Sequence, residues 1–257
     1  MTTSIAFRET PLLAYVLARA DDGLVLGHRL SEWCGHGPML EEDIALANVA
    51  LDLIGQARSL YAYAARLAGE GLTEDHFAYR RDVTGYRNLL LVERPNGDFA
   101  QTIVRQVLFS AMNDPWWRAM MASADETLAA VAAKAEKETA YHLRHAAEWL
   151  IRLGDGTDES HARAQAALDE VWPYTGELFE ADVHERALIE AGVAVDPAAL
   201  RATWDGTVDA ILAEATLTRP AGGWMQRGGR AGRHTEQLGF LLAELQYLQR
   251  AHPEAEW

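Results

Sequence analysis

One uninterrupted segment constrains the fold of this chain more than any other feature. Residues 125–153 contain no glycine and no proline, and their apolar residues recur with the spacing of an α-helix. Four residues of this segment share one helical face at spacings of 4, 3 and 4: Glu138, His142, His145 and Trp149. His142 has apolar neighbours on that face, so we expect it to point into a core. The sequence therefore predicts a long helix that carries ionisable side chains into a bundle.

Carboxylates and imidazoles that project inward from long helices make a metal centre the first hypothesis. Di-iron helical proteins build such centres from Glu-x-x-His motifs, because both side chains then reach one metal from the same turn. Tyr141 stands three residues after Glu138, and no Glu-x-x-His occurs anywhere in the chain. Arg105 and Gln106 stand on another predicted helix where an acid would be wanted, and a cation there would repel iron. The pattern is that of a redox bundle without its metal ligands.

Two interpretations of these side chains remain open. We favour a remnant polar core face whose members bond to one another without metal: Asp52, Glu138, His142 and His145. On this interpretation the chain has no catalytic, cofactor-binding or metal-binding residues. The alternative is an independent di-iron or mononuclear metal oxidoreductase that uses the face of Glu138 and His142. An iron-storage cage is a weaker third hypothesis, since such proteins keep their ferroxidase carboxylates.

The charge of the chain limits its partners and its location. The 257 residues include 38 acids and 23 bases, a net charge of −15, which weighs against nucleic acid and anionic membranes. Cys34 is the single cysteine, so no internal disulfide can form and a reducing cytoplasm is expected. The first residues lack the pattern of a signal peptide. The longest apolar runs are far short of the roughly 20 residues that span a bilayer.

We expect an all-α fold, because the periodicity is helical throughout and prolines stand at boundaries. Pro11 opens a helix to about residue 34 that could bend at Asp22-Gly23. Thr73, Asp98 and Ser123 are expected helix caps. The predicted helices are residues 11–34, 39–67, 77–91, 98–114, 125–153, 157–172, 197–217 and 234–252.

The helix expected over residues 39–67 is broadly apolar. One stripe of it contains Leu40, Ile44, Ala47, Leu51, Ile54 and Tyr61. Leucines on both sides widen the apolar arc, so we expect burial among several neighbouring helices. The remaining polar strip contains Asn48, Asp52 and Gln56.

Two further motifs have both a structural and a functional interpretation. Residues 219–233 are rich in glycine and arginine but lack the Gly-Lys-Ser/Thr of a P-loop. We expect a flexible surface loop. The functional interpretation that we favour for it is a basic docking site for a partner, on a protein that is otherwise acidic. Cys34 and His36 could suggest a nucleophile, but a buried structural thiol is expected.

Several blocks in order resemble one family, that of the non-catalytic structural subunit of the bacterial phenylacetyl-CoA epoxidase, the phenylacetate ring-1,2-monooxygenase. They are LGHRLSEWCGH at residues 26–36, IALAN at 44–48, LDLIGQAR at 51–58, NLLLVE at 88–93, PNGDFA at 95–100, YHLR at 141–144, LGDGT at 153–157, HTE at 234–236 and LQYLQR at 245–250. The resemblance covers nearly the whole chain, from residue 17 to residue 257.

This resemblance implies a ferritin-like helical bundle of the bacterial multicomponent monooxygenase type with additional C-terminal helices, as one domain over residues 1–257. It implies a non-catalytic structural subunit in aerobic phenylacetate catabolism. The partners would be the catalytic subunit, which holds the di-iron centre, and the other subunits of the complex, including an NADPH-dependent reductase. The chain itself would hold no cofactor, and it could form a homodimer when alone.

Overall fold

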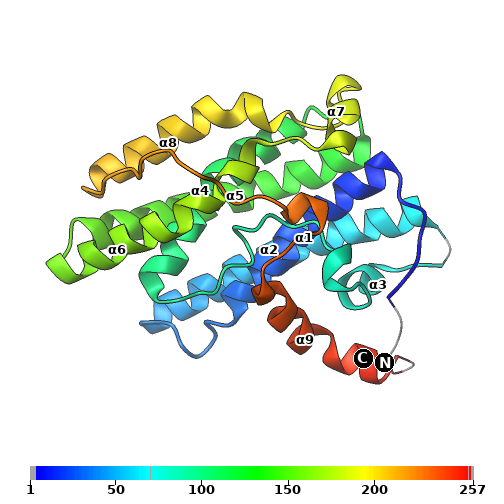
Figure 1. Ribbon diagram of the computed structural model, residues 1–257, viewed down its shortest axis with the longest axis horizontal. Helices are drawn as coiled ribbons and strands as arrows, with labels where there is room; N and C mark the ends of the chain where they lie inside the picture. The colour runs from blue at the N-terminus through cyan, green and yellow to red at the C-terminus, as the bar shows by residue number, and fades with distance from the viewer. Residues whose placement is uncertain (1–3, 70, 254, 256–257) are drawn as a thin grey trace.

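Four long helices, paired as two hairpins, form the centre of the fold (Figure 1). The computed structural model describes residues 4–69, 71–253 and 255. Helix α1 (Pro11–Ser31) packs along α2 (Leu40–Ala68), and α4 (Phe99–Met120) packs along α5 (Glu126–Gly154). The two hairpins meet where α2 contacts α5. Every regular element among the described residues is helical, which confirms the all-α prediction.

Polar caps set the starts of the long helices, largely as the sequence predicts. Thr10 accepts a hydrogen bond from the Leu13 N–H, and Asp98 accepts one from the Gln101 N–H. The predicted cap at Ser123 is wrong by two residues. Asp125 caps α5 instead, while the Ser123 hydroxyl donates to the carbonyl of Val193.

Glycines allow α1 and α2 to approach closely. A Cβ added at Gly23 would lie 2.9 Å from the carbonyl oxygen of Leu53, and one at Gly27 would lie 2.8 Å from the Cγ1 of Ile54. Helix α1 continues through Asp22 and Gly23, so the glycine serves packing between helices at this position.

Shorter helices cover the two hairpins. They are α3 (Glu74–Tyr79), α6 (Asp158–Val171), α7 (Val183–Glu190), α8 (Arg201–Glu214) and α9 (Glu236–Ala251). The helix predicted through residues 77–91 begins at the predicted cap, Thr73, but its extent is wrong. Its helical part ends at Tyr79, and residues 86–92 then run as a largely buried connecting segment between elements. Helix α7 has no counterpart in the prediction, because it is only two turns long.

Other helix boundaries differ by a few residues from those predicted. Helix α4 continues through Pro115 to Met120, although the proline predicts an end or a kink near residue 114. The first predicted helix ends at Ser31 instead of residue 34. Asp196 caps a short 3₁₀ turn that leads into α8, which ends at Glu214 instead of residue 217.

The additional C-terminal helices differ in how they attach to the bundle. Helix α8 lies against α4 and α5, whereas α9 extends from the bundle and contacts α3 (Figure 1). One connected apolar core reaches from Leu13 in α1 to Leu242 in α9. No helix in the described part of the chain is long and apolar enough to cross a membrane. Residues 1–3, part of the segment on which the signal-peptide expectation rests, lie outside the described residues.

Candidate functional site

The predicted polar core face lies where α5 meets α2. The ring of His142 contacts Asp52, with 3.0 Å between Nε2 and Oδ2. The Gln56 side-chain amide donates to Glu138, with 2.9 Å between Nε2 and Oε2. The four residues predicted for this face therefore all lie at the junction of the two hairpins, although they do not bond only to one another.

His145 binds a residue that the sequence analysis missed. Its Nε2 lies 2.8 Å from Oε2 of Glu42, in the first turn of α2. Three consecutive acids open that helix, as is common at a helix N-terminus. Only the position of Glu42 on the inner side of the first turn distinguishes it from Glu41 and Asp43.

The geometry at this junction is pairwise. His142, His145 and Glu138 each contact a different residue of α2. Within the described ranges, no group of three or more His, Cys, Asp or Glu side chains is arranged to hold a metal ion. The contacts are suited to joining two helices, since each acceptor faces one donor.

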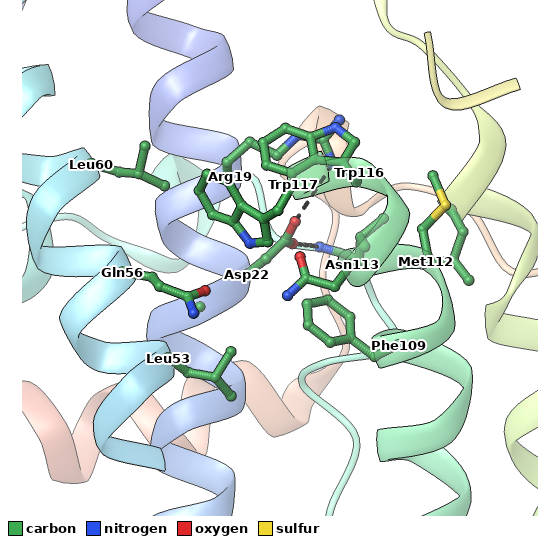
Figure 2. A pocket seen from close by; sticks show the side chains of 13 residues that line it. Arg19, Asp22, Leu53, Gln56, Leu60, Phe109, Met112, Asn113, Trp116 and Trp117 are labelled. Carbon is green, nitrogen blue, oxygen red and sulfur yellow. Dashed lines mark hydrogen bonds and ion pairs between the residues drawn. The ribbon is translucent and has the colours of Figure 1, made fainter. Parts of the chain in front are cut away.

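The centre of the bundle contains a set of buried charges that differs from the predicted one. Figure 2 shows Arg19 and Asp22 of α1 beside two residues of α4, Trp116 and Trp117. The guanidinium of Arg19 lies 4.8 Å from the centroid of the Trp116 ring and forms an ion pair with Glu185 of α7. The sequence analysis did not find this buried ion pair, because Glu185 lies in a helix that it did not predict.

Arg105 does not occupy this centre. Its guanidinium instead donates to the carbonyl of Arg94 and to the side-chain oxygen of Asn96, at the turn before α4. Burial lowers the pKa of Arg105 to about 9, and the nearby cation of Arg29 adds to this effect. Arg105 is therefore a buried cation, as expected, but its long side chain turns back toward the helix N-terminus and binds groups of the turn before α4.

Ion pairs and burial set the protonation of the central groups. Burial raises the pKa of Asp22, although the adjacent guanidiniums of Arg230 and Arg19 oppose part of the rise. Burial also favours the neutral form of Glu185, but the cations of Arg19 and Arg230 outweigh it and lower the pKa of that carboxyl. The charges in this centre are therefore compensated in pairs.

The glycine- and arginine-rich residues 219–233 include an exposed loop at residues 221–224, as the prediction of a surface loop expects, but the residues after it are anchored to the bundle. The backbone N–H groups of Gly228 and Gly229 donate to Glu177, and Arg230 extends inward to Asp22. Arg219 pairs with Asp205 and Asp209 on α8. Arg227 pairs with Glu180. These arginines neutralise acids of the same chain, which removes the charge on which a docking role depended.

Cys34 is exposed in the turn after α1. The predicted buried structural thiol is therefore wrong. The helix ends at Ser31, three residues before the cysteine, so the side chain lies outside the packed segment.

The apolar stripe of α2 gives the largest departure from the prediction, although its last residue, Tyr61, is buried as predicted. Leu40, Ile44 and Leu51 are 71%, 53% and 67% exposed, although the pattern predicts burial. Ala47 and Ile54 are half-buried on the same face. The spacing of 4, 3, 4 and 3 residues along these five positions is the a/d seam of a coiled coil, which packs against another helix. We call these five residues the α2 seam.

Comparisons with known proteins agree over the whole length of the chain. The family model described as phenylacetic acid catabolic protein matches residues 2–257. The C subunit of the 1,2-phenylacetyl-CoA epoxidase of Escherichia coli (strain K12) is 52% identical over 246 residues, which cover 96% of this chain and 99% of that protein.

Proposed function

The chain belongs to the phenylacetic acid catabolic protein family, with its ferritin-like helical fold. From this premise we propose that it is a structural subunit, without an active site of its own, in a cytoplasmic phenylacetyl-CoA epoxidase. In this proposal its partner is the catalytic subunit that carries the di-iron centre. The chain itself binds no cofactor and supports the partner during aerobic phenylacetate catabolism.

The exposed α2 seam is the observation that carries this proposal. Three large aliphatic side chains in heptad register face solvent along one helix. An apolar a/d seam is stabilised by a facing helix, and subunit interfaces supply such helices. The similar protein of E. coli is named as one subunit of an epoxidase, which supports a partner as the source of that helix.

The polar interior supports the absence of a catalytic centre in this chain. The predicted polar face is engaged in contacts between α2 and α5. The charged groups of the bundle centre are engaged in ion pairs. Both sets of contacts connect separate elements of the bundle, which is the role expected of a polar core without a metal.

Co-purification with the catalytic subunit tests the scaffold role. The expected result is a stable complex, and turnover by the catalytic subunit that falls strongly when this chain is left out. The proposal fails if no complex forms, or if the catalytic subunit turns over fully alone.

Iron loading tests the alternative of an independent metal oxidoreductase. The purified chain would be loaded anaerobically with Fe(II) and desalted, and its iron content measured. We expect no retained iron. About two irons per chain with a di-iron Mössbauer signal would overturn the proposal, and Glu138→Ala and His142→Ala variants that lose the iron would locate the site.

A further inference from the structure

Three buried N–H groups near the centre of the bundle have no hydrogen-bond partner among the residues that the structure describes. They are Nε of Arg19 and the indole Nε1 atoms of Trp116 and Trp117. Both indoles are 3% exposed. A buried donor normally has a partner in the protein or in ordered water, because it has lost its bulk hydration. The donor of Arg19 in α1 and the two indole donors of α4 therefore each require an acceptor.

These residues line one cavity between α1, α2 and α4 (Figure 2). The cavity leaves about 30 Å³ for the centres of water-sized molecules. One water-sized sphere itself occupies roughly 10–15 Å³, so a space of this size for water centres has room for about two molecules. Its wall also carries polar groups that can accept from water, namely the carboxylate of Asp22 and the amides of Gln56 and Asn113.

The charges around the cavity decide what kind of molecule fits. Arg19 is paired with Glu185, so its positive charge is already compensated. Asp22 is likewise paired with Arg230, with 2.7 Å between Nη2 and Oδ2. An anion in the cavity would be repelled by the carboxylate of Asp22, and a cation would be repelled by the guanidinium of Arg19. A small neutral molecule that both accepts and donates hydrogen bonds avoids both kinds of repulsion and adds no unpaired buried charge.

We propose that this cavity is a binding site for two ordered water molecules. They accept from the indole N–H groups of Trp116 and Trp117 and from Nε of Arg19. They donate to Asp22 and to the amide oxygens of Gln56 or Asn113. The waters thus connect α4 to α1 and α2 through hydrogen bonds that the side chains cannot make directly. This inference is independent of the proposed function, since it depends only on the interior of this chain.

A high-resolution crystal structure of the full chain tests the proposal. We expect two well-ordered solvent peaks in the cavity, each within hydrogen-bond distance of at least one of the three unpartnered nitrogens. A cavity without solvent density overturns the proposal. Crystals pressurised with xenon give a second readout, because a dry apolar cavity takes up xenon. Xenon density in this cavity would also overturn it.

Two variants locate the waters. Trp117→Phe removes one N–H and keeps an aromatic ring, so we expect the solvent peak bonded to that indole to be lost. Trp204→Phe is the matched control, because its indole donates directly to the carbonyl of Leu108. The control should retain both peaks. Loss of the peaks in the control, or their unchanged presence in Trp117→Phe, would contradict the assignment.

Discussion

The carboxylate of Asp22 in α1 accepts two hydrogen bonds from the guanidinium of Arg230, which lies 208 residues later in the chain. Arg230 also donates to the carbonyls of Ala18 and Arg87. A single side chain therefore joins the C-terminal segment to the first helix and to the segment before α4. An ion pair inside the bundle thus anchors the C-terminal segment.

Removing this cation should strongly destabilise the protein. Arg230→Met leaves the buried carboxylate of Asp22 without its main partner, and breaking a buried pair in this way costs about 3–5 kcal/mol. We expect the free energy of unfolding, measured by urea denaturation, to fall by that amount.

Arg227→Met is the matched control in the same segment. Its guanidinium is mostly exposed and pairs with Glu180 at the surface, where an ion pair contributes about 0–1 kcal/mol. Equal losses in both variants would show that the Asp22–Arg230 pair has no special role.

A charge in the α2 seam should affect assembly and leave the isolated chain folded. Leu51 is largely exposed, so Leu51→Glu should change the free energy of unfolding by no more than about 0.5 kcal/mol. A carboxylate facing a partner helix loses its hydration on binding, and we expect at least about tenfold weaker binding to the catalytic subunit. Titration calorimetry measures the affinity.

Ala213→Glu controls for the added charge, because Ala213 is exposed on α8, far from the seam in sequence. Its affinity for the catalytic subunit should equal that of the wild type. An unchanged affinity in Leu51→Glu would place the interface elsewhere on the chain.

The contact between Asp52 and His142 should stabilise the junction of the hairpins. His142 is buried, and Asp52→Ala would leave its ring nitrogen without the partner shown here. A buried polar group that loses its partner costs about 1–3 kcal/mol. Chemical denaturation should show this loss, whereas Glu148→Ala, at an exposed position of the same α5, should show almost none. A loss below about 0.5 kcal/mol in Asp52→Ala would mean that water replaces the carboxylate.

Buried tyrosines should make the protein less stable at alkaline pH. Burial raises the pKa of Tyr15 to about 12, and it also raises the pKa values of Tyr61 and Tyr86. The unfolded chain ionises its tyrosines near pH 10, whereas the folded chain keeps these hydroxyls neutral. The contribution of these tyrosines to the free energy of unfolding is therefore constant below about pH 10. It is lost as the pH rises from 10 toward the folded-state pKa values.

Urea denaturation between pH 8 and pH 11.5, with tyrosinate absorbance recorded in parallel, measures this loss. Tyr15→Phe should make the decline with pH shallower, by up to about 2 kcal/mol at the alkaline limit. A decline that is as steep in Tyr15→Phe as in the wild type would show that Tyr15 ionises normally in the folded state.

Local chemistry in the sequence determined the all-helical class, most helix starts and the existence of a polar face on α5. Thr73 and Asp98 cap their helices where the sequence predicts, because a cap acts on backbone groups only two or three residues away. The inward direction of His142 also follows from helical spacing within one segment. These features need no knowledge of the neighbouring helices.

Tertiary structure alone decided which partners these residues meet. Spacing shows that the α2 seam is apolar, but it does not show whether the same chain covers that face. Glu42 and Glu185 acquire their roles from residues about 100 or more positions away, His145 and Arg19. Composition alone does not show that Gly228 and Arg230, within the glycine-rich residues 219–233, bond to the buried carboxylates of Glu177 and Asp22. Burial and pairing depend on contacts between distant segments, and only the packed chain specifies those contacts.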